Sequence, residues 1–300
     1  TVVVDEQTAV KIFLLAKCKI AVFDCGKMVN ESIIKLAKDL GALTFQVSKV
    51  LGDFYYKGAD ISCYISQQHI DNDTAQGANI PETYIYSNNF LFDRTGEGLP
   101  RSLSKEEFCD KYNLNPNKDI YAYFPTAIQC LNADPKSQNV YRKVCDSVDN
   151  LIIKLHPNEY ARWKADRVDY KWSYELYTDK KVPVLEQIDA HWCYTYASCG
   201  IAYQSGIGTE FGIYETPFIY VNDGEMKPQG TAGPWWKGNY SWCGTGCNVQ
   251  ELDDVILNKE YFVGDSSIYQ RHKEKFLAYP NEHGYKILSQ QILLYLGKIS

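Results

Sequence analysis

The sequence predicts an α/β protein made of two Rossmann-like, doubly wound domains that face a cleft. The first observation is that short apolar runs rich in β-branched residues alternate with helix-length segments along the 300-residue chain. The second is that one polar, turn-rich segment near residue 100 interrupts this alternation. Strands separated by helices of this length form parallel sheets through right-handed crossovers, which place helices on both faces. Two such sheets, one on each side of the interruption, are therefore expected.

The first half of the chain alternates predicted strands and helices. Apolar, β-branched runs predict strands at 1–4, 19–23, 43–47, 61–65 and 83–86. Apolar residues at helical spacing predict helices at 7–17 and 28–40, and Gly41 ends the second of these. In the turn-rich segment, Ser104 and Glu107 have the spacing of a capping box, which predicts that a helix starts there.

The second half repeats this alternation. Strands are expected at 120–124, 151–155, 182–185, 201–204 and 218–221, and helices at 139–148, 188–197, 249–258, 267–279 and 283–296. The sequence thus predicts a first domain at 1–92, a linker at 93–118, a second domain at 119–280 and a C-terminal helix at 281–300. Whether this last helix crosses back to the first domain is left open.

Composition and charge narrow the class of protein. A net charge of −6 and a pI near 5.5 argue against a nucleic-acid partner. No apolar run approaches the ~20 residues of a transmembrane span, and the opening run 2–4 passes at once into Asp5, unlike a signal peptide. The ten cysteines include no CxxC pair and no zinc-type spacing. We expect a cytoplasmic protein with reduced thiols and no transmembrane segment.

The stretch 201–221, IAYQSGIGTEFGIYETPFIYV, predicts a strand, a glycine-containing turn, a short helix and a second strand. Ser205 is placed to cap a helix that begins near Ile207, and Gly206 and Gly208 allow the backbone to approach another group closely. Such glycines are also common in any Rossmann-like sheet, so a purely structural role stays open. The N–H groups at a helix start bind anions, and Glu210 in the first turn is placed to accept hydrogen bonds from a ribose diol.

Polar side chains also follow two other predicted strands. Thr126 comes after the strand at 120–124, and Lys154, His156 and Glu159 lie at the end of the next one. Because the carboxyl ends of parallel strands meet at one edge, these loops and the glycine turn are expected to surround one site. They supply a hydroxyl, a cation, an imidazole and backbone donors, which together suit a diphosphate. The structural alternatives are a solvated Lys154 and a His156 that only ends its strand.

These motifs resemble those of GT-B-fold transferases. The run 152–159, IIKLHPNE, the turn SGIGTE at 205–210 and the following Pro217-Phe218-Ile219 resemble the CDP-glycerol glycerophosphotransferase and capsule-polysaccharide (Kdo-transferase-like) families. The resemblance covers roughly residues 90–222. It implies that Glu210 contacts the ribose of a nucleotide donor. It also implies that the donor phosphates are contacted by His156, Ser205, Gly206, Ile207, Gly208 and Thr209.

The function implied by this resemblance is that of a metal-independent glycosyltransferase in glycan or polysaccharide synthesis. Such an enzyme moves a sugar, or a sugar-like group, from a UDP-, GDP- or CDP-activated donor to the hydroxyl of a glycan or small-molecule acceptor. The nucleotide-sugar is a substrate, and no cofactor or metal is expected, because cationic side chains can stabilise the leaving phosphate. Two alternatives stay open: a sugar-nucleotide 2-epimerase on the same fold, and a non-enzymatic two-domain sugar-binding protein.

The catalytic base is less well defined by the sequence. An inverting transferase needs a carboxylate or an imidazole beside the acceptor hydroxyl. The candidates are Asp24 at the end of a predicted strand, His69 in an expected loop, and Asp5. The run Asp71-Asn72-Asp73 has the DxD pattern of GT-A metal sites, but we interpret it as a turn. The first domain is short for an acceptor domain, and its usual first loop does not align.

Overall fold

The computed structural model describes 18–24, 31–48, 58–75, 77, 79–88, 103–125, 135–156, 160, 182–186, 190–202, 207–222, 244–257, 266–280 and 282–299. The chain divides into two compact units. Unit 1 consists of Thr1–Arg94, Gly230–Trp235 and Glu274–Ser300, and unit 2 of Thr95–Gln229 and Trp236–Lys273. The strand expected at 1–4 and the helix expected at 7–17 lie outside the described residues.

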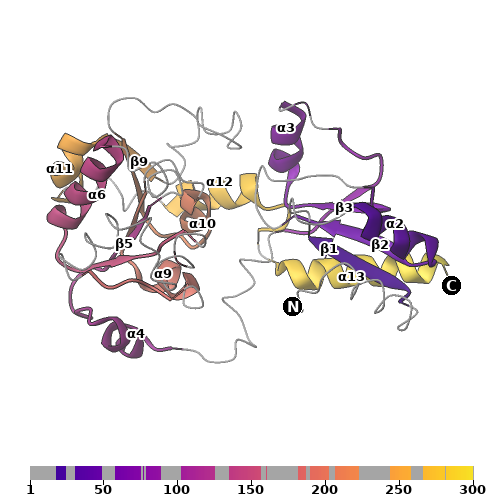
Figure 1. Ribbon diagram of the computed structural model, residues 1–300, viewed down its shortest axis with the longest axis horizontal. Helices are drawn as coiled ribbons and strands as arrows, with labels where there is room; N and C mark the ends of the chain where they lie inside the picture. Colours follow the sequence, from indigo (N-terminus) through magenta and orange to yellow (C-terminus); the bar gives the residue numbers. More distant parts are fainter. Residues whose placement is uncertain are drawn as a thin grey trace. The chain divides into compact units, whose positions relative to one another are not determined.

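Unit 1 contains a four-stranded, wholly parallel sheet (Figure 1). Its strands follow the chain in the order β1 (Ile20–Asp24), β2 (Leu43–Val47), β3 (Ile61–Tyr64) and β4 (Tyr84–Tyr86). Among its described residues, this unit contains the helices α2 (Glu31–Asp39), α3 (Gln67–Ala75) and α13 (Gly284–Ile299). The strands predicted at 19–23, 43–47, 61–65 and 83–86 are all present, with bounds that differ by one residue at most.

The C-terminal helix α13 packs on the sheet of unit 1. Its apolar side chains at Leu288, Ile292 and Tyr295 contact a core cluster on β2 and β3 that includes Phe45 and Ile61. The rings of Phe45 and Tyr295 meet edge to face, with centroids 6.1 Å apart. In Figure 1, α13 (yellow) accordingly lies along these strands. Burial of this apolar stripe fixes the end of the chain to the first sheet.

The segment that leads into α13 is held by Asn88, which follows β4. The Asn88 side chain donates to the carbonyl oxygens of Tyr279 (2.7 Å) and Glu282 (3.0 Å) and accepts from the Tyr279 amide (2.9 Å). Asn88 has a φ of 54°, a left-handed conformation that asparagine tolerates better than most residues. Ala278 adds a backbone hydrogen bond to Ile65 after β3.

Unit 2 contains a five-stranded parallel sheet with the strand order β6-β5-β7-β8-β9. The strands are β5 (Tyr121–Phe124), β6 (Leu151–Ile153), β7 (Cys199–Ala202), β8 (Phe218–Asn222) and β9 (Gly244–Asn248). The helical elements are α4 (Lys105–Tyr112), α6 (Pro135–Ser147), α9 (Ala190–Tyr196), α10 (Ile207–Ile213), η5 (Val249–Glu251), α11 (Leu252–Leu257) and α12 (Ser266–Phe276). The division between the two units falls within α12.

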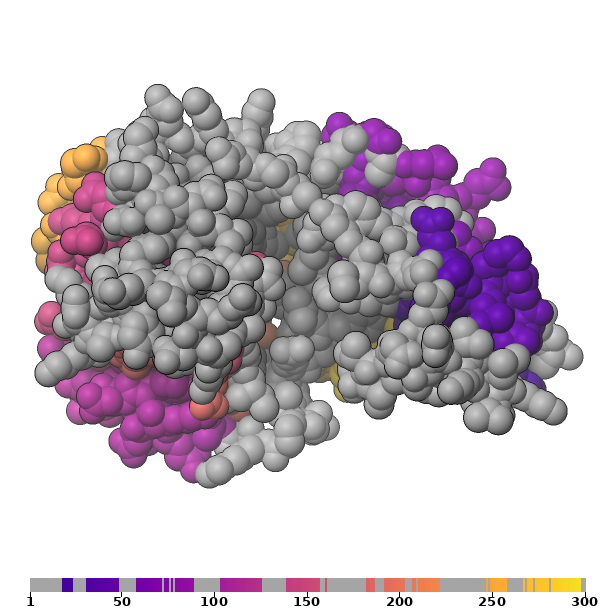
Figure 2. Space-filling view, viewed as in Figure 1, coloured from indigo at the N-terminus to yellow at the C-terminus, as the bar shows by residue number. Residues whose placement is uncertain are grey.

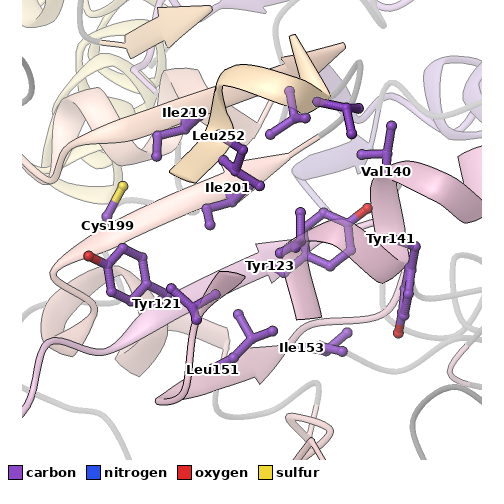
Figure 3. Packing of buried hydrophobic residues seen from close by; sticks show 14 of the residues in the cluster. Tyr121, Tyr123, Val140, Tyr141, Leu151, Ile153, Cys199, Ile201, Ile219 and Leu252 are labelled. Atoms are coloured by element: carbon purple, nitrogen blue, oxygen red, sulfur yellow. The ribbon is translucent and has the colours of Figure 1, made fainter. Parts of the chain in front are cut away.

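One hydrophobic cluster of unit 2 lies on one face of its sheet. Successive strand residues point to opposite faces, so Tyr123 and Ile201 join this cluster, where they meet Tyr141 of α6 and Leu252 of α11 (Figure 3). The two helices lie side by side on the surface, α6 in pink and α11 in orange (Figure 2). An ion pair between Lys143 and Asp253 joins them. The opposite face, with Phe124, is covered by α9 and α10.

The capping box predicted in the turn-rich segment is confirmed. The Glu107 amide donates to the Ser104 hydroxyl at 3.1 Å, and the Ser104 amide donates to the Glu107 carboxylate at 2.8 Å. Asn113, with a φ of 53°, ends the helix in a left-handed conformation. Ser104 and Glu107 therefore satisfy N–H groups at the helix start, as their spacing predicted.

Two local predictions are wrong, and one strand was not predicted. Val184 makes only an isolated bridge to Ile153, where a strand was expected at 182–185, and Pro183 there has no N–H to donate to a ladder. The glycine-rich segment 244–248 forms strand β9, which was not predicted because glycine disfavours strands. Residues 67–75 form α3 and not a loop with a turn, although their sequence is polar and has little helical periodicity.

None of the described helices is long and apolar enough to cross a membrane.

Candidate functional site

The candidate site lies at the carboxyl ends of three adjacent strands in unit 2. Strand β5 lies between β6 and β7, and all three run parallel. Lys154 and His156 follow β6 directly, while Glu210 lies in α10, which comes after β7. The end of β5 is Phe124, which pairs with Ala202 at the end of β7. The described residues Lys154 and His156 and the helix α10 therefore lie at one rim, with the end of β5 between them.

Lys154 is anchored at this rim by its backbone. Its amide donates to the carbonyl oxygen of Tyr123 at 2.9 Å, and its Nζ atom lies 6.0 Å from the centroid of the Phe124 ring. Burial lowers the pKa of the Lys154 ammonium below its ordinary value, and the attraction of the Glu210 carboxylate opposes this lowering. Lys154 and Glu210 thus lie on either side of the end of β5, near enough for the charge of the carboxylate to act on the ammonium.

His156 is half-buried two residues further on. Burial lowers the pKa of its imidazole below the ordinary value, and repulsion from the Lys154 ammonium lowers it further. Its carbonyl oxygen accepts a hydrogen bond from the Tyr160 amide at 2.9 Å. An imidazole held beside a lysine favours an anionic group, because an anion bound there would relieve the repulsion between them.

Glu210 is half-buried in α10 and interacts with a second element, α9. Its carboxylate accepts a hydrogen bond from the hydroxyl of Tyr194. Burial raises the pKa of Tyr194 well above its ordinary value, and the charge and hydrogen bond of Glu210 add to this. A carboxylate placed so can also accept hydrogen bonds from the hydroxyls of a bound ligand.

Gly208 has a structural reason to be glycine. A Cβ atom at this position would overlap the hydroxyl oxygen of Tyr220 on β8 and would lie 2.6 Å from its Cζ atom. Gly200 on β7 is equally constrained, because a Cβ there would lie 2.6 Å from the Phe218 ring and 2.7 Å from the Phe211 ring. The close approach at Gly208 is thus made to the neighbouring strand.

Most of the remaining residues predicted for the donor site lie outside the described part of the chain. Ile207 is the half-buried first residue of α10, while the side chain of Thr209 lies outside the described residues. The others outside the described residues are Thr126, Glu159, Ser205 and Gly206.

The three candidate bases all belong to the chain segment of unit 1. Asp5 lies outside the described residues, and Asp24 is the last residue of β1, with a side chain that is also outside them. His69 lies in α3 and is fully buried. Its Nδ1 atom accepts from the Ile65 amide at 3.5 Å, and its Nε2 atom lies 3.6 Å from a carboxylate oxygen of Asp73.

Burial lowers the pKa of His69 to about 3. The imidazole is thus neutral and shielded from solvent. Its ring meets the ring of Tyr64 edge to face, with centroids 5.2 Å apart. Within the described part of the chain, no three His, Cys, Asp or Glu side chains are grouped as metal ligands would be.

Two residues at the rim were missed from the sequence. Tyr194 and Phe124 connect the charged groups, because their rings stack almost in parallel, with centroids 6.1 Å apart. The only indication was that the helix before the glycine turn is rich in aromatic residues, AHWCYTY. Its proximity to Glu210 depends on how α9 and α10 pack on the same face of the sheet, which no sequence pattern reveals.

The comparisons with known proteins define a class of fold. No protein-family model matches this sequence, and no curated protein sequence matches it. Solved structures do match: they are GT-B-like enzymes that act on nucleotide sugars and related donors. The chain therefore has an α/β fold of the two-domain, Rossmann-like GT-B type, as its sequence predicts.

Three of these structures illustrate the range of enzymes and bound nucleotides among them. MnaA of S. aureus, solved with UDP, is 13% identical, with a TM-score of 0.57 over 97% of this chain and 78% of that one. The UDP-GlcNAc 2-epimerase of Methanocaldococcus jannaschii, solved with UDP-GlcNAc and UDP, is 15% identical, with a TM-score of 0.54 over 88% and 77%. The wall teichoic acid polymerase TagF, soaked with CDPG, is 10% identical, with a TM-score of 0.55 over 92% and 73%. Sequence identities this low support a similarity of fold alone.

Proposed function

We propose that this protein is a nucleotide-sugar-dependent glycosyltransferase whose donor is held in unit 2 by Lys154, His156 and Glu210. The observation that carries the proposal is that Lys154 and His156, which follow β6, and Glu210, in α10 after β7, lie at the carboxyl edge of one parallel sheet with β5 between them. This arrangement brings a cation and a hydrogen-bond acceptor together at the carboxyl edge of a parallel sheet, where ligands of such sheets bind. The GT-B-like neighbours solved with UDP, UDP-GlcNAc and CDPG support this choice of ligand.

The proposed roles follow from the charges of these groups. Negative charge grows on the nucleotide phosphate as the bond to the sugar breaks, and Lys154 and His156 stabilise that charge. Glu210 accepts hydrogen bonds from the ribose diol. The motif resemblance adds Thr126, Glu159 and the residues 205–209 to the donor site. An acceptor hydroxyl attacks the sugar, and Asp24 or Asp5 takes its proton, because the burial of His69 removes that imidazole from contact with substrate.

The narrower family is proposed on two independent supports. The IIKLHPNE and SGIGTE motifs resemble those of the CDP-glycerol glycerophosphotransferase and capsule-polysaccharide families. TagF, a polymerase soaked with CDPG, is among the structural neighbours. Both favour transfer of a sugar, or a sugar-like group such as glycerol phosphate, during polysaccharide synthesis.

A second candidate function is 2-epimerisation of a nucleotide sugar. It is favoured by a specific observation: the structural neighbours include UDP-GlcNAc 2-epimerases from Methanocaldococcus jannaschii and Rickettsia bellii. Such an enzyme uses the same donor site but needs no acceptor. The two reactions therefore differ in whether the nucleotide is released.

One experiment separates these functions. A thermal-shift panel of UDP-, GDP-, CDP- and TDP-sugars identifies the nucleotide, and the best donor is then incubated alone and with a panel of glycan and glycerol acceptors. Acceptor-dependent release of free nucleotide supports transfer, while isomerisation without an acceptor supports the epimerase. Binding of free sugar in preference to every nucleotide would overturn both.

A matched pair of variants links the result to the site. Glu210→Gln should weaken nucleotide binding, because a neutral amide accepts the ribose hydrogen bonds less strongly. Glu215→Gln is the control, since Glu215 lies five residues further on, is exposed and pairs with Lys273. Equal binding by the two variants would count against the proposed donor site.

A further inference from the structure

Tyr194 is held in a fixed position behind the rim. It is 7% exposed, and its ring packs among three other aromatic rings. The Phe124 ring is stacked on it at 6.1 Å with an interplanar angle of 5°, and the Tyr214 ring at 5.1 Å with an angle of 20°. The Phe211 ring meets it edge to face at 5.1 Å. This packing leaves the Tyr194 hydroxyl little freedom to move.

The same packing places the ring of Tyr194 against α10. Phe211 follows Glu210 directly, and Tyr214 lies one helical turn beyond it, where its amide donates to the Glu210 carbonyl oxygen at 3.1 Å. Residues one turn apart share a helix face. The ring of Tyr194 therefore lies on the face of α10 that carries Glu210, and its hydroxyl donates to the Glu210 carboxylate. Thr216, just after α10, donates from its hydroxyl to the Tyr194 carbonyl oxygen at 3.0 Å.

This hydrogen bond opposes a competing attraction. Lys154 draws the Glu210 carboxylate toward itself, because opposite charges attract strongly where water is partly excluded. A carboxylate paired fully with Lys154 would neutralise the cation that the phosphates need and would turn away from the ribose. A glutamate side chain also has considerable rotamer freedom to lose on binding. A fixed, buried donor such as the Tyr194 hydroxyl holds the carboxylate away from full pairing with Lys154. It also restricts the rotamers of Glu210 before the ligand binds.

We propose that Tyr194 is a positioning residue that holds the Glu210 carboxylate for a ribose diol and so makes the site selective for ribonucleotides over 2′-deoxyribonucleotides. The inference rests on the proposed function, because it assumes that a nucleotide binds at Lys154, His156 and Glu210. Tyr194 itself does not touch the ligand.

The test compares the affinities of UDP and CDP with those of 2′-deoxy-UDP and 2′-deoxy-CDP by calorimetric titration. The wild-type protein should prefer the ribose form by about tenfold or more, as expected for hydrogen bonds to a charged acceptor. Tyr194→Phe keeps the ring and removes the hydroxyl, and it should lower this preference to a few-fold at most. Glu210→Gln should lower it in the same way, and the double variant should be no less selective than Glu210→Gln alone.

Tyr141→Phe is the matched control, because it removes another buried tyrosine hydroxyl from unit 2. Tyr141 lies on α6 and packs against Tyr123, on the opposite face of the sheet from Phe124 (Figure 3). This variant should keep the wild-type preference. The preference is a ratio measured on one protein, so a loss of folded fraction changes both affinities equally and leaves it unaltered.

The possible outcomes distinguish a failure of the positioning role of Tyr194 from a failure of the proposed function. If Glu210→Gln loses the preference while Tyr194→Phe keeps it, the positioning role is wrong and the donor site stands. If the wild-type protein binds the ribose and deoxyribose forms equally well, the inference is also overturned. If it binds none of the four nucleotides or their sugar conjugates, the proposed function falls and this inference falls with it.

Discussion

The ammonium of Lys154 lies over the ring of Phe124, with Nζ 6.0 Å from the ring centroid. A cation at this distance from an aromatic face is attracted to it. Phe124 is the last residue of β5, and its ring stacks on Tyr194, which donates a hydrogen bond to Glu210. The aromatic pair thus connects the lysine that follows β6 with the glutamate of α10.

The first prediction concerns the charge of Lys154. Lys154→Met keeps most of the side-chain volume but removes the ammonium, so affinity for UDP or CDP should fall by about tenfold or more. Titration calorimetry on folded protein measures this. Lys111→Met is the control, because Lys111 is an exposed lysine of unit 2 that pairs with Glu186 at 3.2 Å. Unchanged nucleotide affinity in Lys154→Met would exclude this lysine from the donor site.

The second prediction is a pH dependence of binding. The pKa of His156 is lowered in the free protein, and a bound diphosphate raises it, so binding takes up a proton between the two values. Affinity for a nucleotide sugar should therefore increase as the pH falls through this window, whose lower limit lies below the ordinary histidine value of 6.5. Titrations of UDP-GlcNAc between pH 7.5 and 5.5 measure the slope. His156→Asn should abolish it, and a slope that persists in this variant would assign the proton to another group.

The third prediction concerns the packing of α10 on β8. Gly208→Ala forces a Cβ atom against Tyr220, and overpacking of this kind costs about 1–3 kcal/mol, against a gain of about 1 kcal/mol from helix propensity. The free energy of unfolding of unit 2 should fall. Gly297→Ala on α13 is the comparison, since a Cβ there meets nothing within 4 Å and should stabilise the helix by up to about 1 kcal/mol. Urea unfolding measures both; a stabilising Gly208→Ala would contradict the packing described.

The fourth prediction concerns acid stability in unit 1. The pKa of His69 is lowered from 6.5 to about 3 by burial, so the unfolded state binds more protons between these values. Stability is complete above pH 6.5 and is lost as the pH falls toward 3, at about 1.4 kcal/mol per pH unit. Hydrogen exchange of β3 amides at pH 7.5 and 5.0 should show a loss larger by about 2 kcal/mol in wild type than in His69→Gln. Equal losses in the two proteins would show that His69 is not held neutral.

Much of the fold follows from local sequence patterns. Buried strands such as 43–47 and 61–65 can be predicted because most of their residues are apolar, β-branched or small, with Gln46 as the exception. The capping box at Ser104 can be predicted from the sequence because both of its hydrogen bonds form within four residues. In contrast, β9 is a strand because β8 offers it a ladder, a tertiary cause that outweighs the low strand propensity of Gly244 and Gly246.

The candidate site shows the same division. Lys154, His156 and Glu210 could be proposed from the sequence, because residues at the ends of parallel strands share an edge. Tyr194 and Phe124 could not, because their roles depend on ring contacts between α9, α10 and β5. His69 was misplaced in a loop, because the amphipathic pattern that identifies a helix is almost absent from QQHIDNDTA.

The most direct measurement is a structure of the protein with UDP or CDP bound. The account predicts that the diphosphate lies against Lys154 and His156 and that the ribose hydroxyls lie within hydrogen-bonding distance of the Glu210 carboxylate. A nucleotide bound away from the carboxyl ends of β5, β6 and β7 would contradict it.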